Sequence, residues 1–208
     1  MTHRTVRAAA AVLLFLSVSS ACAAPSTTTR EPDGRPVPLL PRPPVTDADI
    51  AFMQEMIGHH AQALVMADMV PTRTSRRDLG TLAERIIVSQ RDEIAIMKQW
   101  LRDHGAAVPD SSAHVHPGMP MMPGMLSAAQ FDQLRAARGP DFEHLFLRLM
   151  VQHHSGAIVM VDKLFATHGA GQDDFMFKFA SDLAADQESE IARMESMLGA
   201  MSPPAGRP

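Results

Sequence analysis

Side chains that can bind a soft metal ion occur in two groups with the same internal spacing. Each group reads Met-x-x-His-His with a further methionine six residues on, and the second group follows the first after 94 residues. The eight residues are Met56, His59, His60 and Met66, then Met150, His153, His154 and Met160. Imidazole suits copper, zinc, nickel or iron, whereas thioether is a poor ligand for hard ions and a good one for copper(I). The pattern therefore favours a site for copper(I), or for its surrogate silver.

Helical geometry places the four donors of each group on one face. Because each residue of an α-helix advances by about 100°, Met56, both histidines and Met66 share one broad side of the helix. Phe52 and Ala63 lie on the same side, which predicts that this face is buried in an apolar core. A buried neutral imidazole needs partners both for its N–H and for its lone pair. A metal ion or a hydrogen-bond network would supply them.

A second repeated segment adds carboxylates and more thioethers. Glu93 and Met97 stand one helical turn apart, and Glu190 and Met194 repeat them 97 residues later. A hairpin of two helices, duplicated, predicts an all-α four-helix bundle with pseudo-two-fold symmetry. Such bundles build metal sites in the core from side chains on facing helices. All four of these residues are therefore candidate metal ligands.

Capping residues and helix breakers set the expected boundaries of the bundle. Thr46 has the spacing to Asp49 of a helix start, and Pro71 is expected to end that first helix after Val70. The expected helices are 46–70, 75–104, 141–168 and 173–198, with a short one after Ser127 stopped by Gly139-Pro140. The bundle then covers 46–200, as repeat one (46–105), a Met/His-rich linker (106–126) and repeat two (127–200).

The linker is low in helical signal and is expected to be flexible. It offers a possible secondary metal site, formed by His114, His116, Met119, Met121, Met122 and Met125. Tracts rich in methionine and histidine can hand soft ions onward, but a segment without preorganisation binds them weakly. The alternative is a connection whose composition is incidental.

The N-terminal residues predict export. Residues 1–21 combine Arg4 and Arg7 with an apolar stretch too short to span a bilayer, as in a signal peptide. Cys22, the only cysteine, lies where a bacterial lipoprotein carries its lipid. This favours anchoring at the outer face of the cell membrane. The alternative is cleavage after residue 23 or 24, which gives a soluble secreted or periplasmic protein.

Prolines and threonines make residues 22–45 an expected flexible tether, and residues 201–208 an expected disordered tail. The formal charge of −4, one Trp and no Tyr give neither a basic surface nor stacking platforms for nucleic acid. No Ser/His/Asp set or phosphate-cradling loop stands out.

Three classes of function remain open. Without further cysteines or a repeated Glu-x-x-His motif, structural zinc and a carboxylate-bridged di-iron centre are disfavoured. A metal-dependent oxidase would need paired bridging acids, for which only Glu93 and Glu190 are placed, so a binding role ranks above an enzyme. The third class is a structural or partner-binding lipoprotein, in which Glu93 and Glu190 accept hydrogen bonds from core histidines. The same network could also load metal.

The repeated Met-x-x-His-His, each copy followed by Gln-x-x-Glu-Ile-x-x-Met, resembles the domain-of-unknown-function 305 family over roughly residues 46–200. The resemblance implies an exported, ferritin-like bundle, and some members resemble periplasmic copper-binding proteins that use Met and His. It points to the methionines, histidines and glutamates named above as metal ligands. Members often have Pro before the His pair, where this chain has Gly58 and Gln152. The expected function is to bind copper outside the cytoplasm, and to buffer it or pass it to a delivery partner.

Overall fold

The computed structural model describes residues 43–110 and 121–201. The predicted signal peptide, Cys22 and nearly all of the tether lie outside these residues, as do His114, His116 and Met119 of the linker and the tail after Met201. The described residues belong to one compact unit, Arg42–Pro208. Among them no helix is long and apolar enough to cross a membrane.

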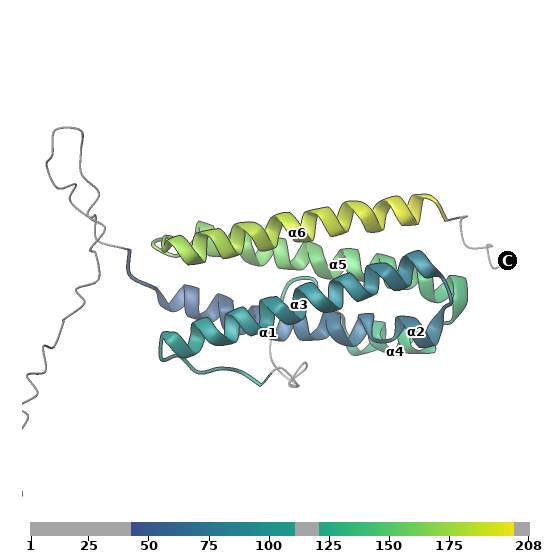
Figure 1. Ribbon diagram of the computed structural model, residues 1–208, viewed down its shortest axis with the longest axis horizontal. Helices are drawn as coiled ribbons and strands as arrows, with labels where there is room; N and C mark the ends of the chain where they lie inside the picture. Colours follow the sequence, from purple (N-terminus) through teal and green to yellow (C-terminus); the bar gives the residue numbers. More distant parts are fainter. Residues whose placement is uncertain (1–42, 111–120, 202–208) are drawn as a thin grey trace, which may run out of the picture. The chain divides into compact units, whose positions relative to one another are not determined.

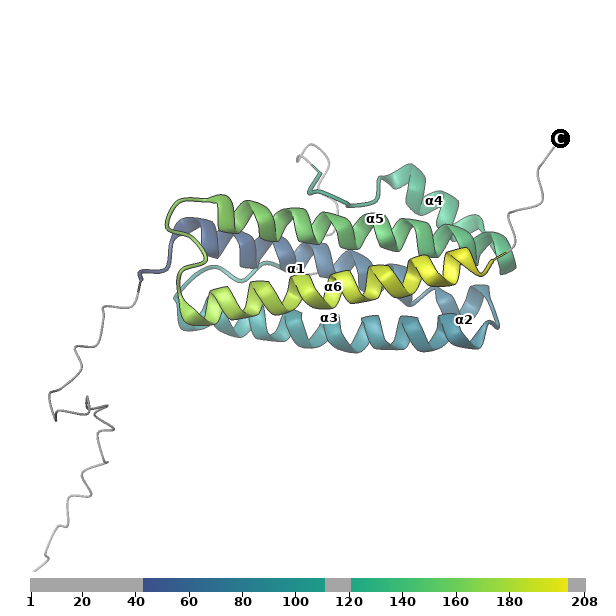
Figure 2. The ribbon, with the colours of Figure 1, turned by 90° about the horizontal axis from the view of Figure 1, so that it is seen from above.

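Two helical hairpins form a four-helix bundle (Figures 1 and 2). The first hairpin pairs α1 (Asp47–Ala67) with α3 (Arg77–Asp103), and the second pairs α5 (Gly139–Ala166) with α6 (Asp174–Gly199). The hairpins meet mainly where α1 packs on α5. Two short helices complete the described part of the chain, α2 (Val70–Arg73) between α1 and α3, and α4 (Ala128–Ala136) against α5. The predicted all-α bundle of duplicated hairpins is confirmed.

Side-chain caps begin two of the helices where the sequence predicts. Thr46 and Asp49 form a capping box at the start of α1, and Ser127 forms one with Gln130 at the start of α4. The Asp49 carboxylate also accepts the Gly171 N–H at 2.7 Å, which ties the start of α1 to the turn between α5 and α6. One cap therefore both orients α1 and joins the two hairpins.

Two prolines behave differently from the prediction. The first helix ends at Ala67 rather than Val70, and Pro71 lies in the first turn of α2 instead of terminating α1. Likewise α5 already begins at Gly139, with Pro140 in its first turn. Both positions suit proline, because the first turn of a helix has no intrahelical acceptor for the N–H that proline lacks.

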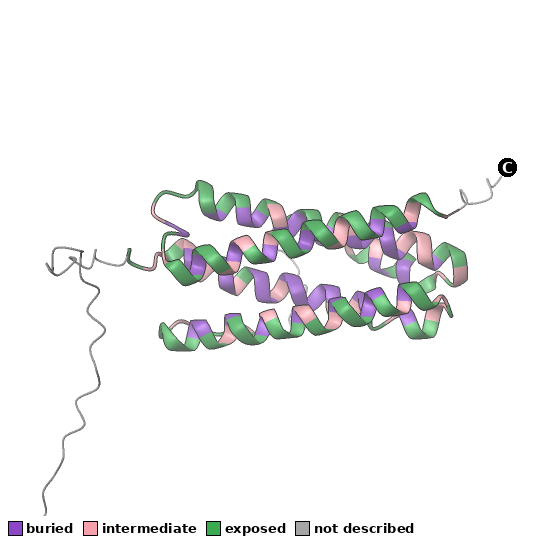
Figure 3. Cartoon of the chain, turned by 45° about the horizontal axis from the view of Figure 1, so that its top comes forward, coloured by how far each residue is buried: buried purple, intermediate pink, exposed green. Residues whose placement is uncertain are grey.

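The apolar core is divided into two clusters along the bundle. One lies around the start of α1 and the end of α5, and includes Phe52 and Leu164. The other lies around the end of α1 and the start of α5, and includes Val70 and Phe142. These pairings show that α1 and α5 run antiparallel. Figure 3 shows the buried residues along the sides of the helices that face one another.

Candidate metal centre

Four imidazoles meet between the two apolar clusters. His59 and His60 come from α1, and His153 and His154 from α5, and all four are completely buried. The His59 and His153 rings lie 3.9 Å apart between centroids. Within each pair the centroids are 6.4 Å apart in α1 and 6.1 Å apart in α5. Because His59 and His153 are repeat counterparts, the pseudo-two-fold axis passes between their rings, and the imidazoles form one contiguous group.

Two of the imidazoles contact carboxylates on the second helix of their own hairpin. Nε2 of His60 donates to Oε2 of Glu93 at 2.6 Å, and Nε2 of His154 donates to Oε2 of Glu190 at 2.7 Å. A carboxylate can only accept, so each Nε2 carries the hydrogen. The two glutamates are mostly buried, with 14% and 19% of their side chains exposed. Each bond ties the two helices of a hairpin together at the same level of the bundle.

The other two imidazoles donate to backbone carbonyls. Nε2 of His59 lies 3.0 Å from the carbonyl oxygen of Pro123, and Nε2 of His153 lies 3.1 Å from the carbonyl oxygen of His59. A carbonyl oxygen only accepts, so the hydrogen is again on Nε2. The repeat is not symmetric here, because one acceptor comes from the linker and the other from α1.

The remaining ring nitrogen of every imidazole has no partner among the described residues. Nδ1 of all four histidines is buried and has no hydrogen bond to the described residues. When the hydrogen is on Nε2, a neutral imidazole presents its lone pair at Nδ1. Polar atoms buried without a partner are costly and uncommon in native proteins. A neutral imidazole whose other nitrogen is held by a carboxylate or a carbonyl is also the usual form of a metal ligand.

Burial keeps the two central imidazoles uncharged. Desolvation first, and the neighbouring His60 second, lower the pKa of His59 from 6.5 to about 3, although its bond to the Pro123 carbonyl acts in the opposite direction. Desolvation, followed by the effect of His59, also holds the pKa of His153 well below its usual range. Protons therefore do not compete for the lone pairs at neutral pH.

The six predicted methionines are buried and fall into two sets, one in each apolar cluster. The first methionine set comprises Met56, Met97 and Met160, and the second methionine set comprises Met66, Met150 and Met194. Each set takes two thioethers from one hairpin and one from the other. This grouping follows from the antiparallel packing of α1 on α5, which brings the early part of one helix beside the late part of the other.

No group of three or more His, Cys, Asp or Glu side chains in the described part of the chain is arranged to hold a metal ion. Each apolar cluster beside the imidazoles contains three of the buried thioethers. Thioethers suit copper(I) or silver better than zinc or magnesium.

The last residues of the linker are packed on the bundle, unlike the flexible segment that the sequence predicts. Residues 121–126, here called the strap, cross α1 and α5 beside the imidazoles. Gln62 binds the backbone of Leu126 in both directions, with its Oε1 accepting at 2.7 Å and its Nε2 donating at 3.3 Å. Gly156 gives the strap room, because a Cβ built there would lie 2.1 Å from the carbonyl oxygen of Pro123.

Sequence reasoning missed Gln62, Pro123 and Gly156, which position the strap. It also missed Gln152, whose Nε2 donates to the strap carbonyl of Gly124 at 3.2 Å. The signal that could have found them is that the two copies differ beside the histidines, where Gln62 is matched by Gly156 and Gly58 by Gln152. The predicted secondary site is not gathered within the described residues. Met121 is 59% exposed, Met122 packs beside the cluster of the first methionine set, and Met125 is buried elsewhere in the strap.

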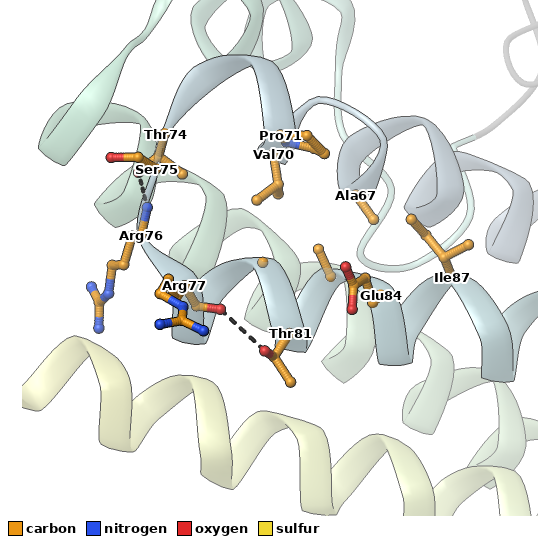
Figure 4. A pocket seen from close by; sticks show the side chains of 12 residues that line it. Ala67, Val70, Pro71, Thr74, Ser75, Arg76, Arg77, Thr81, Glu84 and Ile87 are labelled. Atoms are coloured by element: carbon orange, nitrogen blue, oxygen red, sulfur yellow. Dashed lines mark hydrogen bonds between the residues drawn. The ribbon is translucent and has the colours of Figure 1, made fainter.

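Two cavities on the described surface differ in their relation to the donors. One, of about 350 Å³ and shown in Figure 4, lies at the turn between α2 and α3, near Arg76 and Thr81, and no His or Met lines it. The other, of about 130 Å³, lies between α1 and α5 and is lined by Met160 and Pro123. Of these two, the smaller adjoins a donor described above.

A family model and similar solved structures both place this chain among the same group of proteins. The family model described as "Domain of unknown function (DUF305)" matches residues 49–198. No curated protein matches the chain. Among solved structures, a DUF305 fragment from Deinococcus radiodurans is 32% identical, covers 76% of this chain and 100% of its own, and has a TM-score of 0.64. A DUF305 protein from Streptomyces coelicolor is 28% identical over 73% of this chain and 92% of its own, with a TM-score of 0.63.

A third similar structure is that of CopM in the Cu(II)-bound form. It is 30% identical, covers 73% of this chain and 95% of its own, and has a TM-score of 0.60. CopM structures in the Cu(I)-bound and Ag-bound forms also match.

Proposed function

This chain belongs to the DUF305 family, and from that premise we propose that it binds copper(I) in the core of the bundle, outside the cytoplasm. The ligands are Nδ1 atoms of the four buried histidines together with thioethers of the two methionine sets. The bound ion is cargo, to be buffered or passed on, and the bundle holds it away from water.

The observation that carries the proposal is the state of the four imidazoles. All are buried, all have the hydrogen on Nε2, and all have an Nδ1 without a partner in the described part of the chain. Four desolvated lone pairs in one place are unfavourable for a bundle that has no ion to satisfy them. Thioethers on both sides supply the soft donors that would favour copper(I) over zinc.

Glu93 and Glu190 take a supporting role in this proposal. Each carboxylate contacts Nε2 of a histidine, the position from which an outer carboxylate fixes the tautomer and raises the basicity of a ligating imidazole. The repeat pattern of the sequence predicts both glutamates as ligands. We propose instead that they act through His60 and His154.

The relatives support this reading. CopM, which is 30% identical, has structures bound to Cu(II), Cu(I) and silver. The Streptomyces relative is described as a candidate secreted protein, in agreement with the export signal read in residues 1–21. Attachment through a lipid on Cys22 and a delivery partner remain proposals that rest on the sequence.

The experiment is a titration of the protein with copper(I), copper(II), silver and zinc, each against a competing chelator. We expect the tightest binding for copper(I) and silver. Replacement of all four core histidines by leucine should abolish that binding, while His104→Leu, at the cap of α3, should leave it unchanged. Circular dichroism reports whether the quadruple variant stays helical. Unchanged affinity in a helical quadruple variant would refute the site.

A structural role is the second candidate, and one observation favours it. The histidine–glutamate bonds join α1 to α3 and α5 to α6 whether or not a metal is present. If the protein binds none of the four ions, a structural role explains the histidine–glutamate bonds better than copper binding does. The next experiment would then be to identify a protein partner. An oxidase is less well supported, because each of the two carboxylates contacts the histidine of its own hairpin.

A further inference from the structure

The two methionine sets differ in their access to solvent. Met160 of the first set is 4% exposed and lines the cavity of about 130 Å³ between α1 and α5. Its repeat counterpart in the second set, Met66, is completely buried. Exposed Glu55 and Lys163 line the same cavity as Met160. The cavity therefore connects the surface with one thioether.

Two residues that line this cavity are much smaller than their repeat counterparts. Ala48 and Ala51 line it on α1. The matching positions on α5 carry Phe142 and Leu145, and Glu55 is matched by Leu149. Phe142 is completely buried, and it packs in the same cluster as Leu126 of the strap and Leu134 of α4. The second methionine set is thus covered by large apolar side chains at the place where the first set adjoins a cavity.

We propose that this cavity is the entrance through which copper(I) or silver reaches the core, with Met160 as the first thioether that the ion meets. The proposal rests on the proposed copper-binding function and adds the route and the order of loading. The first methionine set fills directly from solvent, and the second set fills only when an ion passes inward or when the core opens locally.

Charge and chemistry at the mouth fit such a route. The Glu55 carboxylate gives an incoming cation a weak, exposed attraction, and the buried thioether behind it binds soft ions more strongly than hard ones. Lys163 at the same mouth has the opposite charge sign, so the attraction is local to Glu55. Met66, Met150 and Met194 of the second set are completely buried, so an ion reaches them from outside only after local movement of packed side chains, which is slow compared with diffusion into an open cavity.

The test fills the cavity with the larger residue that is found at the matching position of the second repeat. Ala51→Leu places a leucine where the second half has Leu145, on a half-buried helix position that accepts it. Copper(I) transfer from a coloured chelator complex to the protein should become roughly tenfold slower, because entry now requires a conformational change. The final stoichiometry and affinity should stay those of the natural protein. Ala48→Phe provides a second filling variant if Ala51→Leu does not fold.

Thr81→Leu is the matched control, because it fills the cavity in Figure 4, which adjoins no donor. Its transfer rate should equal that of the natural protein. A second readout follows methionine methyl signals by NMR after silver is added below stoichiometry. The Met160 signal should shift before that of Met66.

The outcomes separate the entrance from the binding function. If the natural protein binds neither copper(I) nor silver, the proposed function fails and the entrance fails with it. If it binds both but Ala51→Leu loads at the natural rate, or Met66 shifts as early as Met160, the function stands and the entrance is refuted.

Discussion

The two ends of the bundle hold the same kinds of donor atoms in different surroundings. The first methionine set adjoins a cavity lined by alanines, whereas the second lies beneath large side chains of α4, α5 and the strap. Each set nevertheless contains two thioethers from one hairpin and one from the other. The duplication therefore repeats the ligands, while the positions around them determine how an ion could reach each set.

The centre of the molecule shows the same difference on a smaller scale. His59 and His153 are repeat counterparts in ring contact, yet His59 donates to the strap and His153 donates to α1. The strap can pass on one side only, because Gly156 leaves space where its counterpart Gln62 binds Leu126 instead. The Gln62/Gly156 difference between the repeats thus contributes to the asymmetry of the centre. The Gly58/Gln152 difference also contributes, because Nε2 of Gln152 donates to the strap carbonyl of Gly124 at 3.2 Å.

Acidification tests the central imidazoles, which lie between the two methionine sets. Of the changes considered, it should have the largest effect on the free energy of unfolding. The pKa of His59 is lowered to about 3 and that of His153 is well below 6.5 in the folded protein. Below pH 6.5 the unfolded chain binds protons at these residues that the folded chain does not. Stability should be fully present above pH 6.5 and fall as the pH decreases, by about 1.4 kcal/mol per pH unit for each imidazole.

Urea unfolding of the metal-free protein at several values between pH 7 and pH 5 measures this slope. The variant with both His59→Leu and His153→Leu should show a clearly flatter profile over the same range. A natural protein whose stability is independent of pH in this window would mean that the central imidazoles are not held neutral.

Gly156→Ala tests the asymmetry of the centre directly. The new Cβ would lie 2.1 Å from the Pro123 oxygen and 2.5 Å from the Cα of Gly124, so the strap must move and His59 loses its acceptor. We expect a loss of about 3 kcal/mol, from overpacking and an unpartnered buried N–H. Gly80→Ala meets no atom within 4 Å and should instead stabilise α3 by up to about 1 kcal/mol. Equal unfolding midpoints for the two variants would contradict the packing of the strap.

Gln62→Met removes the other attachment of the strap while nearly preserving volume. The Leu126 N–H and carbonyl are buried and would lose their partner side chain. The expected cost is about 2 kcal/mol, because a buried backbone group is left unsatisfied. Hydrogen exchange at the Leu126 amide should become faster than in the natural protein, whereas the amide of Leu82 in α3 should change only with global stability. Unaltered protection at Leu126 would show that Gln62 does not hold the strap.

The sequence predicts the elements and the donors well, for a physical reason. Three features depend only on residues close together in the sequence: the helical periodicity, the caps at Thr46 and Ser127, and the repeated donor pattern. They can therefore be predicted without knowing how the hairpins pack. The grouping of Met160 with Met56 is not local, because it depends on the antiparallel meeting of α1 and α5. The strap and the cavity are harder still. They follow from small residues such as Ala51 and Gly156, which show their effect only when compared with their repeat counterparts.

Removal of either Glu93 or Glu190 should give the smallest effect, a change in copper(I) affinity. Comparing the two variants tests whether the two ends of the bundle bind copper(I) alike. Glu93→Leu leaves Nε2 of His60 without its acceptor, and Glu190→Leu does the same to His154. Each should lower copper(I) affinity by about tenfold, as loss of an outer partner of a metal ligand does. Glu84→Leu, on an exposed position of the same helix as Glu93, should leave affinity unchanged in a matched competition titration. Equal losses from the two variants would show that the ends share one binding chemistry and differ only in access. A loss confined to one variant would place the tight site at that end, and no loss in either would remove the glutamates from metal binding.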